Sequence, residues 1–137
     1  YMSSFEYFDR ANEKGYDKFT QIAANLAMVA KMPKDLREDL TVIFLTHSED
    51  STDINGNRKI KAKTIGKMID NTLTLEGLFS IVLFGKVNKN DDGELEYGFE
   101  TQNSGENTCK SPMGMFEDKF IPNDLAYVKE CIQKYEE

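Results

Sequence analysis

The stretch TVIFLTHSED, residues 41–50, places a polar cluster directly after an apolar run. The run TVIFLT is rich in β-branched and aromatic residues and shows no alternation of apolar with polar positions. This pattern is typical of a strand that is covered on both faces, as in a parallel sheet flanked by helices. We therefore predict an α/β fold with a central strand at residues 41–46, followed by His47 and Ser48.

Helical periodicity precedes this strand. Residues 3–14 and 17–31 carry apolar side chains at helical spacing, Gly15 separates the two segments, and Pro33 ends the second. A long helix followed by a central strand is half of a βαβ unit, which supports the α/β prediction.

Two further strands and a last helix are predicted after it. FSIVLFGKV, residues 79–87, reads as a second buried strand, and ELEYGFETQN, residues 94–103, as a third strand joined to it by a hairpin turn. Asn123 or Asp124 then caps a final amphipathic helix.

The bulk composition is that of an ordinary folded protein. The 137 residues are 39% apolar and 30% charged, and a chain of this length buries about two thirds of its unfolded surface as one domain. No apolar run approaches the roughly 18 residues needed to span a bilayer, and the N-terminal sequence lacks the features of a secretory signal. We expect a cytoplasmic protein with no membrane partner.

A basic stretch interrupts an otherwise acidic chain. Residues 49–63 show no periodicity and are predicted to be a mobile loop, with a hairpin turn available at Asn55-Gly56. The formal net charge of −7 argues against a globally basic nucleic-acid binder, but one run of ten residues contains no acid. Its basic residues are solvated, or they contact a phosphate backbone; they are Arg58, Lys59, Lys61, Lys63 and Lys67.

The sequence predicts no metal site. Cys109 and Cys131 form no CxxC pair and are expected to be free thiols. The segment that begins at Asn88 fits the opening of a calcium-binding loop, but Phe99 stands where a bidentate glutamate is needed. A plain hairpin turn explains this segment better.

His47 is the only histidine of the chain. A lone histidine at the end of a strand is often structural. A hydrolase triad is an open but unsupported alternative, because no serine or cysteine partner is identified close to His47 in the sequence and the sequence does not reveal distant partners. In open α/β sheets, however, ligands bind beyond the carboxyl ends of the strands. This position makes His47 a candidate ligand contact.

Four ordered segments resemble the C-terminal part of phage-encoded RecA-like ATPases, the AAA-type ATP-binding proteins associated with recombination and single-strand annealing. The segments are ANEKGYDKF (residues 11–19), LREDLTVIFLTHSED (36–50), KIKAKTIGKMIDNTLTLEGLFSIVLF (59–84) and FETQNSGENTCKSPMGMFEDKFIPNDL (99–125). The resemblance implies a RecA-like P-loop sheet flanked by helices, with a β-hairpin and a C-terminal helix.

The resemblance also assigns roles to individual residues. His47, and less directly Ser48, match the strand end where these enzymes place a polar sensor near the γ-phosphate or the attacking water. The loop of residues 49–67 matches a region that faces DNA, so Arg58, Lys59, Lys61, Lys63 and Lys67 become candidate nucleic-acid contacts. Lys110 resembles a basic residue that approaches the nucleotide and neutralises charge on its phosphates.

The chain departs from that family in one respect. Walker A and Walker B segments precede the matching region in the family, and neither is present here; SGENTCKS, residues 104–111, has Cys109 where a P-loop needs glycine. We therefore expect residues 1–137 to be a single, truncated RecA-like domain. ATP and Mg²⁺ would be cofactors of the complete protein, while this chain alone would bind neither tightly and would not hydrolyse ATP.

The implied function is the coupling of ATP binding and hydrolysis to single-stranded DNA handling in the cytoplasm of a bacterial host cell. Implied partners are single-stranded DNA and either further copies of the chain or a missing N-terminal half. One alternative is a non-catalytic module that binds nucleic acid through residues 58–67. Another is a small interaction protein in which Phe5, Phe8 or Phe44 is buried only by another chain.

Overall fold

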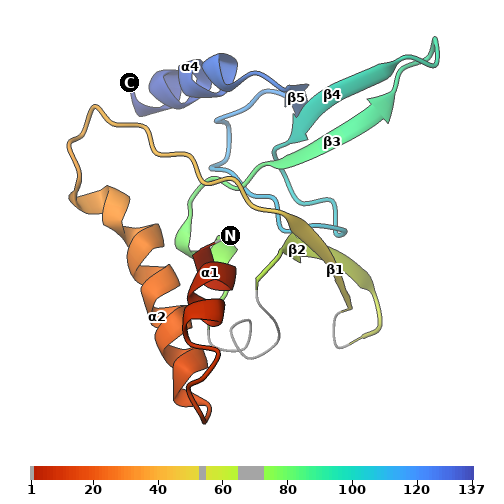
Figure 1. Cartoon of the computed structure of the whole chain (residues 1–137). Coiled ribbons are helices and arrows are strands. Elements are labelled where there is room, and N and C mark those ends of the chain that lie inside the picture. Colours follow the sequence, from red (N-terminus) through yellow and green to blue (C-terminus); the bar gives the residue numbers. More distant parts are fainter. Residues whose placement is uncertain (1, 53–54, 65–72) are drawn as a thin grey trace. The chain divides into compact units, whose positions relative to one another are not determined.

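The computed structural model describes residues 2–52, 55–64 and 73–137 of the chain. These residues form a mixed α/β structure in which helices accompany two small antiparallel sheets (Figure 1). The chain divides into two compact units, Tyr1–Glu49 with Ala62–Phe79 and Asp50–Lys61 with Ser80–Glu137. The α/β class predicted from the sequence is therefore confirmed, whereas the expected parallel pairing is wrong because both sheets are antiparallel.

Two helices dominate the first unit, α1 (Met2–Asp9) and α2 (Asp17–Lys31). The turn between them contains Gly15 at a φ of 98°, a conformation that glycine adopts without a steric penalty. The short 3-10 helix η1 (Met32–Asp35) follows α2 directly, because the missing N–H of Pro33 prevents regular continuation. The second predicted helix is confirmed at both ends, whereas the first ends earlier than expected.

The core of the first unit is small. Ile22 and Ala23 of α2 are buried, and Tyr7 of α1 and Leu73 pack against them. A second 3-10 helix, η2 (Leu75–Leu78), contacts α2 and buries Leu75. The buried residues of α2 thus lie on one face of the helix, as the helical spacing of its apolar residues predicts.

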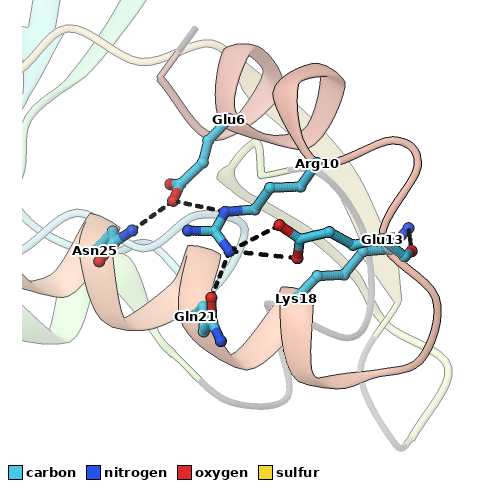
Figure 2. A network of polar contacts seen from close by, with 6 residues as sticks. All are labelled: Glu6, Arg10, Glu13, Lys18, Gln21 and Asn25. Carbon is cyan, nitrogen blue, oxygen red and sulfur yellow. Dashed lines mark hydrogen bonds and ion pairs between the residues drawn. The ribbon is translucent and has the colours of Figure 1, made fainter.

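Arg10 connects α1 to α2 through polar contacts (Figure 2). Its guanidinium pairs with Glu6 at 3.4 Å and with Glu13 at 3.3 Å, and it donates a hydrogen bond to the side-chain oxygen of Gln21 on α2. Asn25, one turn further along α2, donates to the same carboxylate of Glu6. Polar contacts therefore complement the small apolar core between the two helices.

The predicted central strand at residues 41–46 is absent. This segment forms neither helix nor strand, and it is exposed, with Ile43 at 52% and Leu45 at 89% of their full accessibility. The reason is a lack of partners, since a strand exists only where a neighbour takes up its backbone hydrogen bonds and no described residue does so here. Only Phe44 makes an aromatic contact, with the ring of Phe79 at 5.1 Å.

A β-hairpin replaces the mobile loop that was predicted next. β1 (Ser48–Thr52) pairs with β2 (Arg58–Ala62) in a two-stranded sheet. Gly56 in the connection has a φ of 85°, which confirms the predicted Asn55-Gly56 turn. Beyond the strands, the N–H of Lys63 donates to the carbonyl of His47 at 2.7 Å and extends the ladder by one bond.

The second sheet contains β3 (Phe84–Lys89), β4 (Leu95–Glu100) and β5 (Phe120–Pro122) in that order. The predicted hairpin turn between β3 and β4 is confirmed, with the side chain of Asn90 accepting a hydrogen bond from the N–H of Glu94. The first predicted strand of this pair is wrong in extent: it starts at residue 84 rather than 79. Only Val82 of the earlier residues pairs, in an isolated bridge with Lys110.

The C-terminal helix α4 (Leu125–Glu136) covers one face of the three-stranded sheet. Asp124 caps it by accepting hydrogen bonds from the N–H groups of Ala126 and Tyr127, at 2.8 and 3.4 Å, so the predicted cap is confirmed. The buried residues of this core are Met115, Phe116, Ile121 and Val128. Phe99 of β4 packs against them, so this core lies on the face of the sheet that carries the Phe99 side chain.

Candidate nucleic-acid interface

The basic stretch lies on a strand rather than in a loop. Because side chains alternate along β2, Lys59 and Lys61 share one face of the strand, opposite to Arg58 and Ile60. Lys63 follows the strand and is exposed. Lys67 lies outside the described residues.

Arg58 is held by an acid of the neighbouring strand. Its Nε and a terminal nitrogen donate to the two carboxylate oxygens of Asp50 at 2.8 and 3.1 Å. The hydrogen bond from Arg58 holds the pKa of Asp50 below its usual value, and the same bond raises the pKa of Arg58. A guanidinium paired through two bonds is less available to phosphate, so Arg58 fits a role in fixing the hairpin.

The hairpin is anchored to the loop of residues 103–109. The N–H of Ile60 donates to the carbonyl of Glu106 at 2.7 Å, and Ile60 forms a parallel bridge with Asn107. Both edges of β2 therefore have a neighbour: β1 lies along one edge and this loop contacts the other. Such anchoring orients the face that carries Lys59 and Lys61.

A buried polar network supports that loop. Asn107, only 3% exposed, donates a hydrogen bond to the carboxylate of Glu100, and its side-chain oxygen accepts from the N–H of Cys109 at 3.0 Å. The other oxygen of Glu100 accepts a hydrogen bond from Lys86 at 2.6 Å, which raises the pKa of Lys86. Burial raises the pKa of the Cys109 thiol to about 11, and the nearby Glu100 carboxylate adds to this rise. The Cys109 thiol is therefore protonated near neutral pH, and burial shields it from solvent.

A second set of bonds fixes the ends of the same loop. Thr101 is fully buried, and its hydroxyl donates to the carbonyl of Asp118 at 3.0 Å. Ser111 donates to the carbonyl of Thr101 at 3.1 Å and accepts from the amide of Gln102 at 2.6 Å. The bonds of Ser111 therefore join the two ends of the loop to each other, directly after β4 ends at Glu100.

The predicted nucleotide contacts belong to two different units of the chain. His47 is exposed and immediately precedes β1, and Ser48 is the exposed first residue of that strand. Lys110 is half-buried, and its N–H and carbonyl both pair with Val82, at 3.0 and 2.8 Å. His47 and Ser48 belong to the first unit and Lys110 to the second.

Residues that sequence reasoning did not select form a part-buried polar network. Glu100, Asn107 and Lys86 come from two strands and a loop, and no short motif joins them. The sequence offered one signal. Glu100 is a charged residue near the apolar end of a predicted strand, and such a residue needs a partner when it is buried. The identity of that partner depended on the fold.

Within the described ranges, no group of three or more histidine, cysteine, aspartate or glutamate side chains could hold a metal ion. Both cysteines are free thiols, as predicted. None of the helices in the described part of the chain is long and apolar enough to cross a membrane. Comparison with protein-family models, with curated proteins and with solved structures finds no match.

Proposed function

We propose that this chain is the C-terminal part of a RecA-like ATPase and that its β1–β2 hairpin contacts single-stranded DNA. The observation that carries the proposal is the arrangement of the basic stretch on β2. Lys59 and Lys61 share a face, and Lys63 follows them. Lysines presented by an ordered hairpin can follow a phosphate backbone without reading its sequence.

The pairing of Arg58 sharpens this proposal. Arg58 faces Asp50, so its charge is largely balanced within the hairpin, whereas Lys59 and Lys63 make no ion pair with any described residue. Lys59 and Lys63 therefore supply positive charge that a phosphate backbone would meet. Arg58 keeps the two strands in register and contributes to DNA binding only indirectly.

The position of His47 offers a connection between nucleotide and DNA. In the proposal His47 senses the γ-phosphate of ATP, with Ser48 beside it, and Lys110 neutralises phosphate charge in the complete enzyme. The carbonyl of His47 accepts the N–H of Lys63, so a shift of His47 on nucleotide binding would act directly on the base of the hairpin. ATP would in this way change the presentation of the lysines to DNA.

The test is a salt series of binding to a fluorescently labelled oligothymidine by residues 1–137 in the absence of ATP. Each phosphate of a single strand that a lysine neutralises contributes about 0.7 to the slope of log K against log salt. Substitution of Lys59, Lys61 and Lys63 by glutamine should therefore reduce the slope by about 2 and weaken binding at low salt. Fluorescence anisotropy measures both quantities.

The control variant carries the same change of charge elsewhere. Lys34, Lys129 and Lys134 are exposed lysines outside the hairpin, and their replacement by glutamine should leave the slope unchanged. Equal losses in both variants would reduce the effect to net charge and contradict the proposal. Absence of any salt-dependent binding by the unmodified chain would also contradict it.

A further inference from the structure

The apolar face of the three-stranded sheet extends beyond the part that α4 covers. Phe99 and its partner Ile121 point into the core below α4. Because alternate residues of a strand share a face, Tyr97 and Leu95 of β4 lie on this same face, and Val87 of β3 stands directly opposite Tyr97. Their exposures are 59%, 57% and 49% for Tyr97, Leu95 and Val87. Three neighbouring apolar side chains are thus exposed in the half of the β3–β4 hairpin that leads to the turn. In Figure 1 the ribbon of this half extends beyond α4 and β5.

The backbone next to this face is unpaired as well. Tyr97 of β4 and Thr101, which directly follows β4, make backbone hydrogen bonds toward the β5 side, with Asn123 and Lys119. Glu96, Gly98 and Glu100, which alternate with these residues, must then bond to β3, because backbone groups alternate in direction along a strand. In the register of the pair, the N–H and C=O groups of Gly85, Val87 and Lys89 consequently point away from β4. No described residue takes up these groups, so β3 is an open edge strand.

Gly85 leaves room at the inner end of that edge. It lies opposite Phe99, and a Cβ atom placed on it would meet no atom within 4 Å. A glycine inside a strand often marks a place where another backbone or a ligand approaches closely. The space above Gly85 can accept a side chain from an added segment that continues onto Val87.

The charge around the β3–β4 turn indicates what kind of segment would bind along β3. Residues 88–97 contain four exposed acids and one lysine, which gives a local net charge of −3; these are Asp91, Asp92, Glu94, Glu96 and Lys89. An acidic turn repels nucleic acid and attracts basic chains. This end of the second unit therefore has the opposite preference to β2.

We propose that the edge of β3 from Gly85 to Lys89 binds an extended, basic segment of a partner protein as a fourth strand. Main-chain hydrogen bonds to Gly85, Val87 and Lys89 would supply affinity, and apolar side chains of the segment would cover Val87 and Tyr97. Lysine or arginine side chains of the segment would lie near the acids of the turn. This surface is independent of the lysines proposed to contact DNA.

The experiment is a two-dimensional NMR titration of the ¹⁵N-labelled chain with the blocked peptide Lys-Val-Lys-Leu-Lys-Val-Lys. Saturable shifts confined to the amides of β3 and its face are expected, and they should weaken as salt is added. A peptide with glutamate in place of lysine should not bind. A lysine peptide that is N-methylated at alternate residues should not bind either, because it cannot pair along an edge.

Two variants test the location. Tyr97→Ser should lower the affinity for the lysine peptide at least tenfold, whereas Tyr135→Ser, a matched change of an exposed tyrosine on α4, should not. Amide spectra of both variants report whether they remain folded. Binding of the glutamate peptide, equal binding by Tyr97→Ser, or no binding of the lysine peptide would overturn the proposal.

The same NMR spectra distinguish a basic protein segment from other molecules that could occupy the edge of β3. Shifts of the β3 amides that depend on protein concentration without peptide would identify a second copy of the chain as the occupant. Shifts of these amides with oligothymidine would identify nucleic acid. Either result would overturn the assignment to a basic protein segment.

Discussion

At the scale of single residues, the two glycines of the β3–β4 pair have opposite surroundings. A Cβ atom on Gly98 would lie 2.3 Å from Cζ of Phe120 and 2.6 Å from the carbonyl oxygen of Ile121. The carbonyl belongs to the neighbouring strand and cannot move without disturbing the sheet. Gly85, in contrast, has open space around its Cβ position. The sheet thus has no room for a side chain at position 98, whereas it has room for one at position 85.

We expect Gly98→Ala to lower the free energy of unfolding by about 1–3 kcal/mol, as overpacking in a filled site does. The physical reason is displacement of Phe120 and of β5 from β4. Urea denaturation followed by circular dichroism measures the loss. The matched change Gly85→Ala should alter stability by less than about 0.5 kcal/mol, as is usual at unconstrained surface positions. A larger loss at Gly85 than at Gly98 would contradict this packing.

Cys109 gives a second residue-scale prediction, on pH. Its pKa rises from 9.0 to about 11 in the folded chain, so the folded state retains a proton that the unfolded state releases between these values. Stability contributed by the neutral thiol is complete below pH 9 and is lost as the pH rises toward 11.

Measured as the midpoint of urea unfolding, the decline between pH 9 and 11 should be steeper for the unmodified chain than for Cys109→Ala. Comparison of the two chains cancels the titration of tyrosines and lysines that both contain. Parallel curves for the two chains would show that Cys109 is not protected in the folded state. Thiol labelling at about pH 8 should accordingly modify the half-buried Cys131 before Cys109.

At the scale of elements, β2 shows how tertiary contacts override composition. Lysine is depleted in strands, and RKIKA contains a single strongly strand-forming residue, Ile60. The strand nevertheless forms, because the N–H of Ile60 bonds to Glu106 on one side and β1 pairs on the other. A stretch that reads as a loop thereby becomes a fixed surface.

The pair α1 and α2 offers an element-scale prediction. Arg10 has contacts with both helices, whereas Lys14 is exposed and makes no described contact. Arg10→Gln should therefore loosen α1 from α2 and lower the stability of this unit by about 1 kcal/mol, the typical net contribution of such hydrogen bonds.

Hydrogen exchange of the α1 amides measures this effect. Arg10→Gln should speed exchange in α1 about fivefold, while Lys14→Gln should leave it unchanged. Unchanged α1 protection in the Arg10 variant would mean that the apolar contacts of Tyr7 hold α1 in place without help.

At the scale of the whole molecule, the proposed ATPase function makes a prediction about this chain and a longer one. Residues 1–137 contain no P-loop, which supplies the backbone amides and lysine that hold ATP phosphates. We expect no Mg²⁺-dependent phosphate release from ATP by these residues alone, as measured by a coupled phosphate assay.

A chimaera that adds a P-loop segment of a RecA-like ATPase should hydrolyse ATP. His47→Ala should lower its turnover at least tenfold, because phosphoryl transfer depends on the positioning of the attacking water and of charge. Lys129→Gln on α4 serves as the control. Turnover that is insensitive to His47→Ala would exclude His47 as the sensor, and hydrolysis by residues 1–137 alone would contradict the inferred dependence on a P-loop.

The sequence by itself determined the features that depend on neighbours along the chain. These are helix α2 with its end at Pro33, the turns at Gly56 and Asn90, and the Asp124 cap of α4. Each follows from a local rule, since a helix stripe, a positive φ or a capping carboxylate involves only a few consecutive residues.

Only the tertiary structure decided what distant residues do together. It left TVIFLT exposed and without a pairing strand among the described residues, because a strand needs a partner and periodicity says nothing about whether a partner is present. It joined Glu100 to Asn107 and Lys86, turned Arg58 toward Asp50, and left the edge of β3 open. These arrangements depend on which strands pair and in which register, and register is set by contacts between residues far apart in the sequence.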